Sequence, residues 1–342
     1  MVLWLVAVAL LAQPTPTRPP PADRPPKAAT PSAPAAGHAG SLDPAHRPAG
    51  LLLGLSTKEG LQTWFIDGVR IDKLGDALAV PGNAGWLAVR LVSADDGKSH
   101  REQLYVGKPG AMPPAPPAAE EGCEQTEKVE VTFASGGWIG TDTSVGSSCE
   151  GAAHPTSSRE LKLLAVGSAR AEASSPPIGA ILGTAADAVL PAEWEKGRKK
   201  LGDDNPDCLQ EEPSPTSWTL ARHRGRWAVR LLLPRTSEAC RGLEGTWDFD
   251  TDVSEKIGGA RPASEKQLAD AGPSADAIAA PTGSFVVAVD NDSIKLFANG
   301  KEVAKALTGG AVVMTQWSLG KHVERWRREA KDALRPPQPL GD

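Results

Sequence analysis

The sequence lacks the short motifs by which catalytic and metal sites are commonly recognised. No G-x-S-x-G elbow, H-E-x-x-H pair or complete Walker loop occurs, and the six histidines are scattered without paired spacing. The four cysteines include no C-x-x-C pair, which the common zinc sites need. We therefore expect no catalytic residue, no metal site and no cofactor, and the sequence favours a protein that is not an enzyme.

Two further features are missing: an excess of positive charge and a long apolar run. The formal net charge is −5 and the pI is about 5.8, whereas proteins that bind nucleic acids usually carry a basic face. The apolar run at residues 1–12 is far shorter than the roughly 20 residues that a membrane-spanning helix needs. We expect no nucleic-acid partner and no transmembrane segment in the mature chain.

Residues 1–12 are apolar and uncharged, and their length is typical of the hydrophobic part of a signal peptide. Cleavage after Ala12 would place Leu10 and Ala12 at the recognition positions. No Lys or Arg precedes the run, which leaves open whether the true start lies a few residues upstream. A buried N-terminal strand or helix is the alternative. The sequence predicts an exported protein, periplasmic or extracellular.

Residues 13–50 follow as a segment of Pro, Ala and Thr with scattered charge, and eleven of the 31 prolines precede Ala49. Such a segment buries too little apolar surface to offset the entropy of ordering it, so it is expected to be a disordered linker. A proline-rich stretch after a signal peptide, in a chain rich in Ala, Gly and Arg, is similar to many exported proteins of GC-rich bacteria. This likeness is one of composition and identifies no functional residue.

The remaining chain is expected to be mainly β and rich in hairpins. Runs of β-branched and aromatic residues flank residue pairs that tolerate positive φ, as two-residue hairpin turns require. The expected hairpins join residues 51–56 to 61–66, 86–93 to 102–106, 217–222 to 226–233 and 284–289 to 293–298, and Asn299-Gly300 follows as another turn.

These strands define a β-rich domain over residues 51–320, with flexible loops expected at 109–122 and 261–281 and a division near residue 175 left open. The hairpins recur at uneven intervals, as degenerate propeller blades with insertions would. Residues 93–99, Ser-Ala-Asp-Asp-Gly-Lys-Ser, resemble the Asp-box turn of some propellers, with His100 replacing the usual aromatic residue. Propeller-like and β-sandwich architectures both fit this pattern.

Helical spacing appears in two places. Residues 178–201 have a helix-like pattern, and 264–267 fit a helix cap inside the second expected loop. At the C-terminus, Val323, Trp326, Ala330 and Ala333 predict an amphipathic helix over 321–335, which Pro336 ends. Its charged face is either solvated or a basic surface for an anionic partner.

The four cysteines are Cys123, Cys149, Cys208 and Cys240. An even number in an exported chain predicts two disulfides, for which three connectivities exist. Sequential pairing is favoured, because each pair would then bracket a predicted strand and turn.

Ten tryptophans against one tyrosine leave either a tryptophan-rich core or exposed rings that stack on sugars. The candidates for weak ligand binding are Trp64, Trp138 and Trp218. We expect an exported, non-enzymatic binding module that acts on a protein or glycan of the cell envelope. A secreted hydrolase of glycans or peptides, with carboxylates from distant loops, and a structural or assembly component of the envelope are the alternatives.

Overall fold

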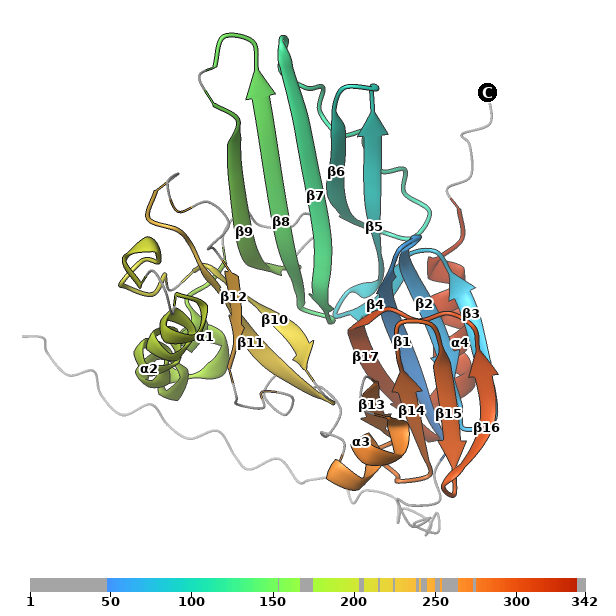
Figure 1. Cartoon of the computed structure of the whole chain (residues 1–342). Helices are drawn as coiled ribbons and strands as arrows, with labels where there is room; N and C mark the ends of the chain where they lie inside the picture. Colours follow the sequence, from blue (N-terminus) through green and yellow to red (C-terminus); the bar gives the residue numbers. More distant parts are fainter. Residues whose placement is uncertain are drawn as a thin grey trace, which may run out of the picture. The chain divides into compact units, whose positions relative to one another are not determined.

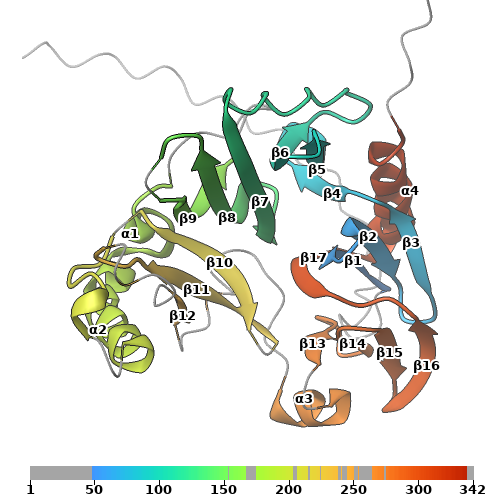
Figure 2. The same ribbon diagram turned by 45° about the horizontal axis from the view of Figure 1, so that its top comes forward.

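Mostly antiparallel strands build four sheets that stand in a propeller-like ring (Figure 1 and Figure 2). The computed structural model describes residues 48–336 except 153, 167–174, 203–205, 215, 224, 238–239, 241–244, 250–252, 254–263 and 273–274. The predicted signal peptide and nearly all of the predicted linker lie outside this range. The mainly β, propeller-like prediction is confirmed. Residues 42–342 cluster as one compact unit, without a division near residue 175.

The first sheet joins the two ends of the folded chain. Its order is β17 (Ala311–Leu319), β1 (Ala49–Thr57), β2 (Gly60–Ile66) and β3 (Ile71–Gly75). Strands β1 and β17 pair antiparallel from Ala49↔Leu319 to Ser56↔Ala311. The ring therefore closes by hydrogen bonds between the first and the last strand, with β1 inside the sheet and β17 at its edge.

The second sheet consists of two three-stranded meanders. One contains β4 (Leu78–Gly82), β5 (Gly85–Asp95) and β6 (His100–Gly107), and the other β7 (Cys123–Ala134), β8 (Trp138–Cys149) and β9 (Thr156–Ala165). Only two parallel pairs, His100↔Thr126 and Arg101↔Glu127, join β6 to β7. The connection over 109–122 contains no helix or strand.

The third sheet carries two helices. It consists of β10 (Trp218–His223), β11 (Arg226–Leu233) and β12 (Gly245–Asp248), and it packs with α1 (Ile178–Leu182) and α2 (Thr184–Leu201). The helix-like pattern over 178–201 is confirmed, with a break at Gly183, whose φ of +85° ends α1. Trp194, Trp218 and Trp227 fill the core between these elements, each at most 1% exposed.

The fourth sheet contains β13 (Asp276–Ala279), β14 (Phe285–Val289), β15 (Ile294–Ala298) and β16 (Lys301–Ala306), with α3 (Glu265–Ala271) beside it. The expected loop at 261–281 thus contains a helix and a strand. Ser264 and Gln267 form the capping box that the sequence suggested. Strand β13 has the weakly β-forming sequence Asp-Ala-Ile-Ala, so it depends on pairing with β14, which local propensity does not reveal.

All four predicted hairpins are present, with the expected partners. Asn299 and Gly300 also form a turn between β15 and β16, with φ values of +51° and +72°. Both values are positive, as a type I′ turn requires, and this explains the Asn-Gly pair at that position.

The β5–β6 turn and the β14–β15 turn have the same hydrogen-bond pattern around an aspartate. The resemblance to an Asp-box in the sequence indicated only the first of them. Asp96 Oδ1 accepts hydrogen bonds from the backbone N–H groups of Lys98 and Ser99. Asp290 Oδ1 accepts from the N–H groups of Asp292 and Ser293 at 2.9 and 2.6 Å. The backbone bonds to Asp96 lower its pKa. Burial by itself would raise the pKa of Asp290, but bonds from Asp292, Ser293 and Lys295 outweigh it and lower the pKa.

A carboxylate whose pKa is lowered by folding stabilises the fold above its unfolded pKa of about 3.9, and this contribution is lost as the pH falls through the folded value. We expect Asp290→Asn to lower the free energy of unfolding by about 1–2 kcal/mol at pH 7, because charge-assisted hydrogen bonds are replaced by the weaker neutral bonds that an amide oxygen can accept. Urea unfolding should show this deficit shrinking below about pH 4. A deficit that stays constant down to pH 3 would contradict the assignment.

At the C-terminus, α4 (Val323–Ala333) confirms the predicted amphipathic helix. Val323, Ala330 and Ala333 are buried in the cluster that α4 shares with the first two sheets, and Trp326 meets Trp86 edge-on at 5.6 Å. Its charged side chains pair with one another and with β3, as in Arg325–Glu329, Arg327–Glu324 and Arg327–Asp72. Among the described helices, none is both long and apolar enough to cross a bilayer.

Both disulfides form with the sequential pairing. Cys123 and Cys149 are register partners at the open end of the β7–β8 hairpin. Cys208 and Cys240 join the segments on either side of the β10–β11 hairpin. Each disulfide thus links the segment that enters a hairpin to the segment that leaves it.

Candidate functional site

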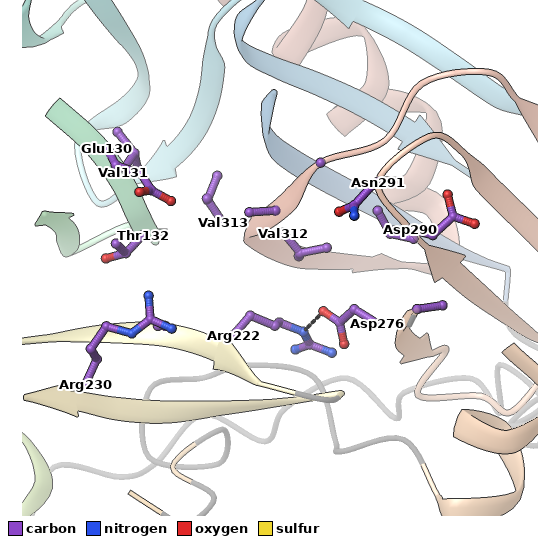
Figure 3. Close-up of a pocket in the computed structure, with 15 residues that line it drawn as sticks. Glu130, Val131, Thr132, Arg222, Arg230, Asp276, Asp290, Asn291, Val312 and Val313 are labelled. Carbon is purple, nitrogen blue, oxygen red and sulfur yellow. Dashed lines mark hydrogen bonds and ion pairs between the residues drawn. The ribbon is translucent and has the colours of Figure 1, made fainter. Parts of the chain in front are cut away.

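A polar pocket of about 270 Å³ lies where strands of all four sheets converge (Figure 3). Strands β7, β10, β13 and β17 contribute most of its wall, together with the turn after β14. Its polar and charged lining residues are Glu130, Thr132, Arg222, Arg230, Asp276, Asp290 and Asn291. Ala275 and Ala311 supply accessible apolar wall between them, and four buried valines lie behind it: Val131, Val289, Val312 and Val313. The pocket therefore offers both fixed charge and apolar surface.

Arg222, on β10, joins the third sheet to the fourth. Its side chain is only 3% exposed, and Nε donates to Asp276 Oδ2 at 2.6 Å while Nη2 donates to the carbonyl of Ala277 at 3.0 Å. Asp276 Oδ1 in turn accepts from the N–H of Gly225 at 2.6 Å. The Arg222 guanidinium also lies 5.4 Å from the Trp227 ring. Nη1 has no hydrogen-bond partner among the described residues.

Arg230, on β11, is the second cation of the pocket. It forms a two-point ion pair with Asp248, Nε to Oδ1 at 2.7 Å and Nη2 to Oδ2 at 3.0 Å. Burial by itself would lower the pKa of Arg230, but Asp248, Glu130 and Asp142 outweigh it and raise the pKa. The charge on Arg230 is therefore permanent, and Asp248 already balances it.

Glu130, on β7, differs from the other charged residues of the pocket because it is exposed and its carboxylate makes no hydrogen bond or ion pair with a described residue. It faces Asp142 in the β7–β8 register, and Asp142 is itself held by Arg159 at 2.9 and 2.6 Å. Figure 3 shows Glu130 and Arg230 on one side of the pocket and Asp290 and Asn291 on the other. Glu130 is thus a carboxylate available to a ligand.

A groove of about 760 Å³ continues from the pocket and shares Glu130, Asn291 and Gly310 with it. It is lined by the β1–β2 turn, the segment 307–310 and residues of β6 and β7. These two strands pair in register at only two positions, and beyond them Glu102 Oε2 accepts a hydrogen bond from the N–H of Val129 at 3.0 Å. Leu307, at 86% exposure, stands at the rim. Pocket and groove form one surface, called the central groove below.

The predicted ligand-binding tryptophans are not brought together and do not line the central groove. Trp218 is fully buried, with its indole N–H donating to the carbonyl of Pro176, and Trp64 is 8% exposed in the core between the first and fourth sheets. These two rings belong to the core because they lie on inward-facing strand positions. Trp138 is half-buried beside the α1–α2 core, and sugar stacking stays a prediction for it alone.

The residues that line the central groove carry no spacing signal in the sequence. Glu130, Arg222, Asp276 and Asn291 come from three different sheets, and Glu130 and Asn291 lie about 160 positions apart in sequence. Only their ring arrangement brings them together. The hairpin pattern predicted the strands and the turn at Asn291, but it gave no order of the sheets around a centre.

A scan of the chain against protein-family models gives no match, and a search of curated proteins gives none either. In the described part of the chain, no group of three or more His, Cys, Asp or Glu side chains is placed to hold a metal ion. Inference about function therefore depends on the geometry and charge of the central groove.

Proposed function

We propose that the folded domain is an exported, non-enzymatic binding module and that the central groove binds a protein of the cell envelope. The observation that carries this proposal is the continuity of groove and pocket at the point where all four sheets meet. An open groove that shares wall residues with a smaller pocket suits an extended polypeptide segment better than a compact small molecule. The ring supplies a rigid frame for such a site.

The charges of the groove support binding more than chemistry. Asp276 is engaged by Arg222 and Gly225, Asp290 by its own turn, and Glu102 by the N–H of Val129. No histidine or cysteine is among the groove's lining residues. A hydrolase would need a positioned base or a pair of free carboxylates there.

Export is supported by the disulfides and by the apolar run at residues 1–12. Disulfides persist in oxidising compartments such as the periplasm or the outside of the cell. Neither feature distinguishes the periplasm from the outside of the cell, so the proposal includes both compartments. The partner is sought among envelope proteins because an exported, tethered module meets these first.

The test is photocrosslinking of the full chain in a secreting host, with a benzophenone side chain at Leu307 in the groove or at Val69, which is 75% exposed and outside the groove. We expect one discrete adduct from position 307 and none from position 69, and Asn291→Trp, which fills the groove, should abolish the adduct. The intact mass should show loss of residues 1–12 and no thiol alkylation before reduction. Equal adducts from both positions, or none from 307, would refute the groove as the binding site.

A further inference from the structure

The central groove carries more acidic than basic side chains. Its acids are Glu59, Glu102, Glu130, Asp276, Asp290 and Asp292, and its bases are Lys58, Lys128, Arg222 and Arg230. Six acids against four bases give the lining a formal charge of −2. The preference of a charged groove follows the sign of its uncompensated charge.

The uncompensated charge is not evenly distributed. Both arginines are held in ion pairs, by Asp276 and Asp248. The lysines line the outer groove but not the pocket, whereas Glu130 lines both. At the mouth of the pocket, Glu130 is therefore the charge that has no hydrogen-bond or ion-pair partner among the described residues.

The pocket behind Glu130 has room for one side chain. Its volume of about 270 Å³ lies below the roughly 300–1,000 Å³ of sites for drug-sized ligands. Ala275 and Ala311 give it accessible apolar surface, whereas Val131, Val312 and Val313 are at most 5% exposed. Lysine and arginine combine an apolar stem with a cationic head, and they pack the stem on apolar surface while the head finds a polar partner.

We infer that the central groove takes an extended segment that inserts one Lys or Arg side chain into the pocket, with Glu130 as its counter-charge. This inference rests on the proposed function and names the chemistry of the bound segment. The stem lies against Ala275 and Ala311, and the head lies between Glu130 and the side-chain amide oxygen of Asn291. Leu91 and Leu307 in the groove offer apolar contacts to neighbouring side chains of an extended segment, in which alternate residues face the same way.

The experiment selects random nine-residue peptides on phage against the full chain. Peptides from the wild type are expected to share a Lys or Arg at one position. Glu130→Gln should weaken binding of a selected peptide about fivefold, the upper end for a solvent-accessible ion pair, and Glu130→Lys should abolish it. Glu124→Gln removes the same charge on the same strand outside the groove and should change nothing. Because Glu130 is exposed, its variants should keep the wild-type urea midpoint, which is measured in parallel.

The outcomes separate the inference from the proposed function. Selected peptides that compete with the Leu307 crosslink but lack a shared basic residue, or that bind Glu130→Gln as tightly as wild type, overturn the cationic-ligand inference and leave the groove as a binding site. Absence of both crosslink and groove-binding peptides overturns both. Binding that weakens equally in Glu124→Gln and Glu130→Gln shows a general charge effect and also overturns the inference.

Discussion

Replacing Asp276 by Ala is expected to lower the free energy of unfolding by about 3–5 kcal/mol, the cost of leaving a buried charge without its partner. The partner is Arg222, whose side chain is 3% exposed and has Asp276 as its ion-pair partner. The same substitution also frees the N–H of Gly225, which now donates to Asp276. One carboxylate thus satisfies a buried cation and a turn.

The Arg222–Asp276 pair lies between two sheets, so we expect its loss to destabilise the whole ring rather than one sheet. Apolar clusters of described residues join the first sheet to the second, the second to the third and the fourth to the first. None of these clusters joins the third sheet to the fourth, where Arg222 bonds to Asp276 and Ala277 instead. Among the described residues, the third and fourth sheets therefore meet at a polar junction, and loss of Asp276 weakens it.

Urea unfolding followed by tryptophan fluorescence measures this effect. Asp292→Ala, in a turn of the same sheet and exposed, should change the free energy by less than about 0.5 kcal/mol. The double variant Arg222→Met, Asp276→Ala should recover part of the loss, because it removes the unpaired charge rather than stranding it. A double variant that is less stable than Asp276→Ala alone would show that the Arg222 stem, rather than its charge, stabilises the junction.

The features that the sequence predicted correctly are those that local chemistry decides. The Asn299-Gly300 turn needs positive φ at both positions, and the Ser264–Gln267 capping box needs only four residues. Strand β13 and the polar junction depend on contacts between residues far apart, such as Arg222 and Asp276, separated by 54 positions. No periodicity encodes such a pair. The site was missed for the same reason, since its lining exists only once four sheets surround a centre.

The tryptophans are a second case in which the sequence alone could not decide the role of a residue. Their abundance predicted either a tryptophan-rich core or a surface for stacking on sugars. The alternation of apolar and polar residues along a strand shows which face of a sheet is buried only when the other face is exposed to water. It gives no such answer for a sheet that is covered on both faces. Trp218 lies on β10 with its ring in the α1–α2 core, so the covering helices decide its burial. Those helices were predicted, but their docking on this sheet was not.

Removing the Cys208–Cys240 disulfide by a double Ser substitution is expected to lower the free energy of unfolding by about 3–4 kcal/mol, as the chain-entropy model gives for a loop of this size. The sequence separation is 32, and Cys240 is 7% exposed. The separation of 26 for Cys123–Cys149 gives nearly the same figure, because the entropy depends on the logarithm of loop length.

The two bonds should nevertheless differ in their measured effect. Cys123 and Cys149 lie at the far end of the β7–β8 hairpin, where Glu124, Thr126 and Lys128 are exposed and no apolar cluster holds the strands. Without the bond, the folded state regains freedom there by fraying, which offsets part of the entropy that the unfolded chain gains. The Cys123→Ser, Cys149→Ser variant should therefore lose less global stability than the Cys208→Ser, Cys240→Ser variant.

Hydrogen exchange by mass spectrometry distinguishes local fraying from global loss. In the Cys123→Ser, Cys149→Ser variant, exchange should accelerate at residues 123–128 and 143–149 and stay unchanged in β10 and β11. In the Cys208→Ser, Cys240→Ser variant, the slowest-exchanging amides of the ring should accelerate together, because they exchange through global unfolding. Equal urea midpoints with uniform acceleration in both variants would mean that the far end of the β7–β8 hairpin is as firmly held as the core. The strand ends near Cys123 and Cys149 would then be more resistant to local opening than the exposure of their side chains implies.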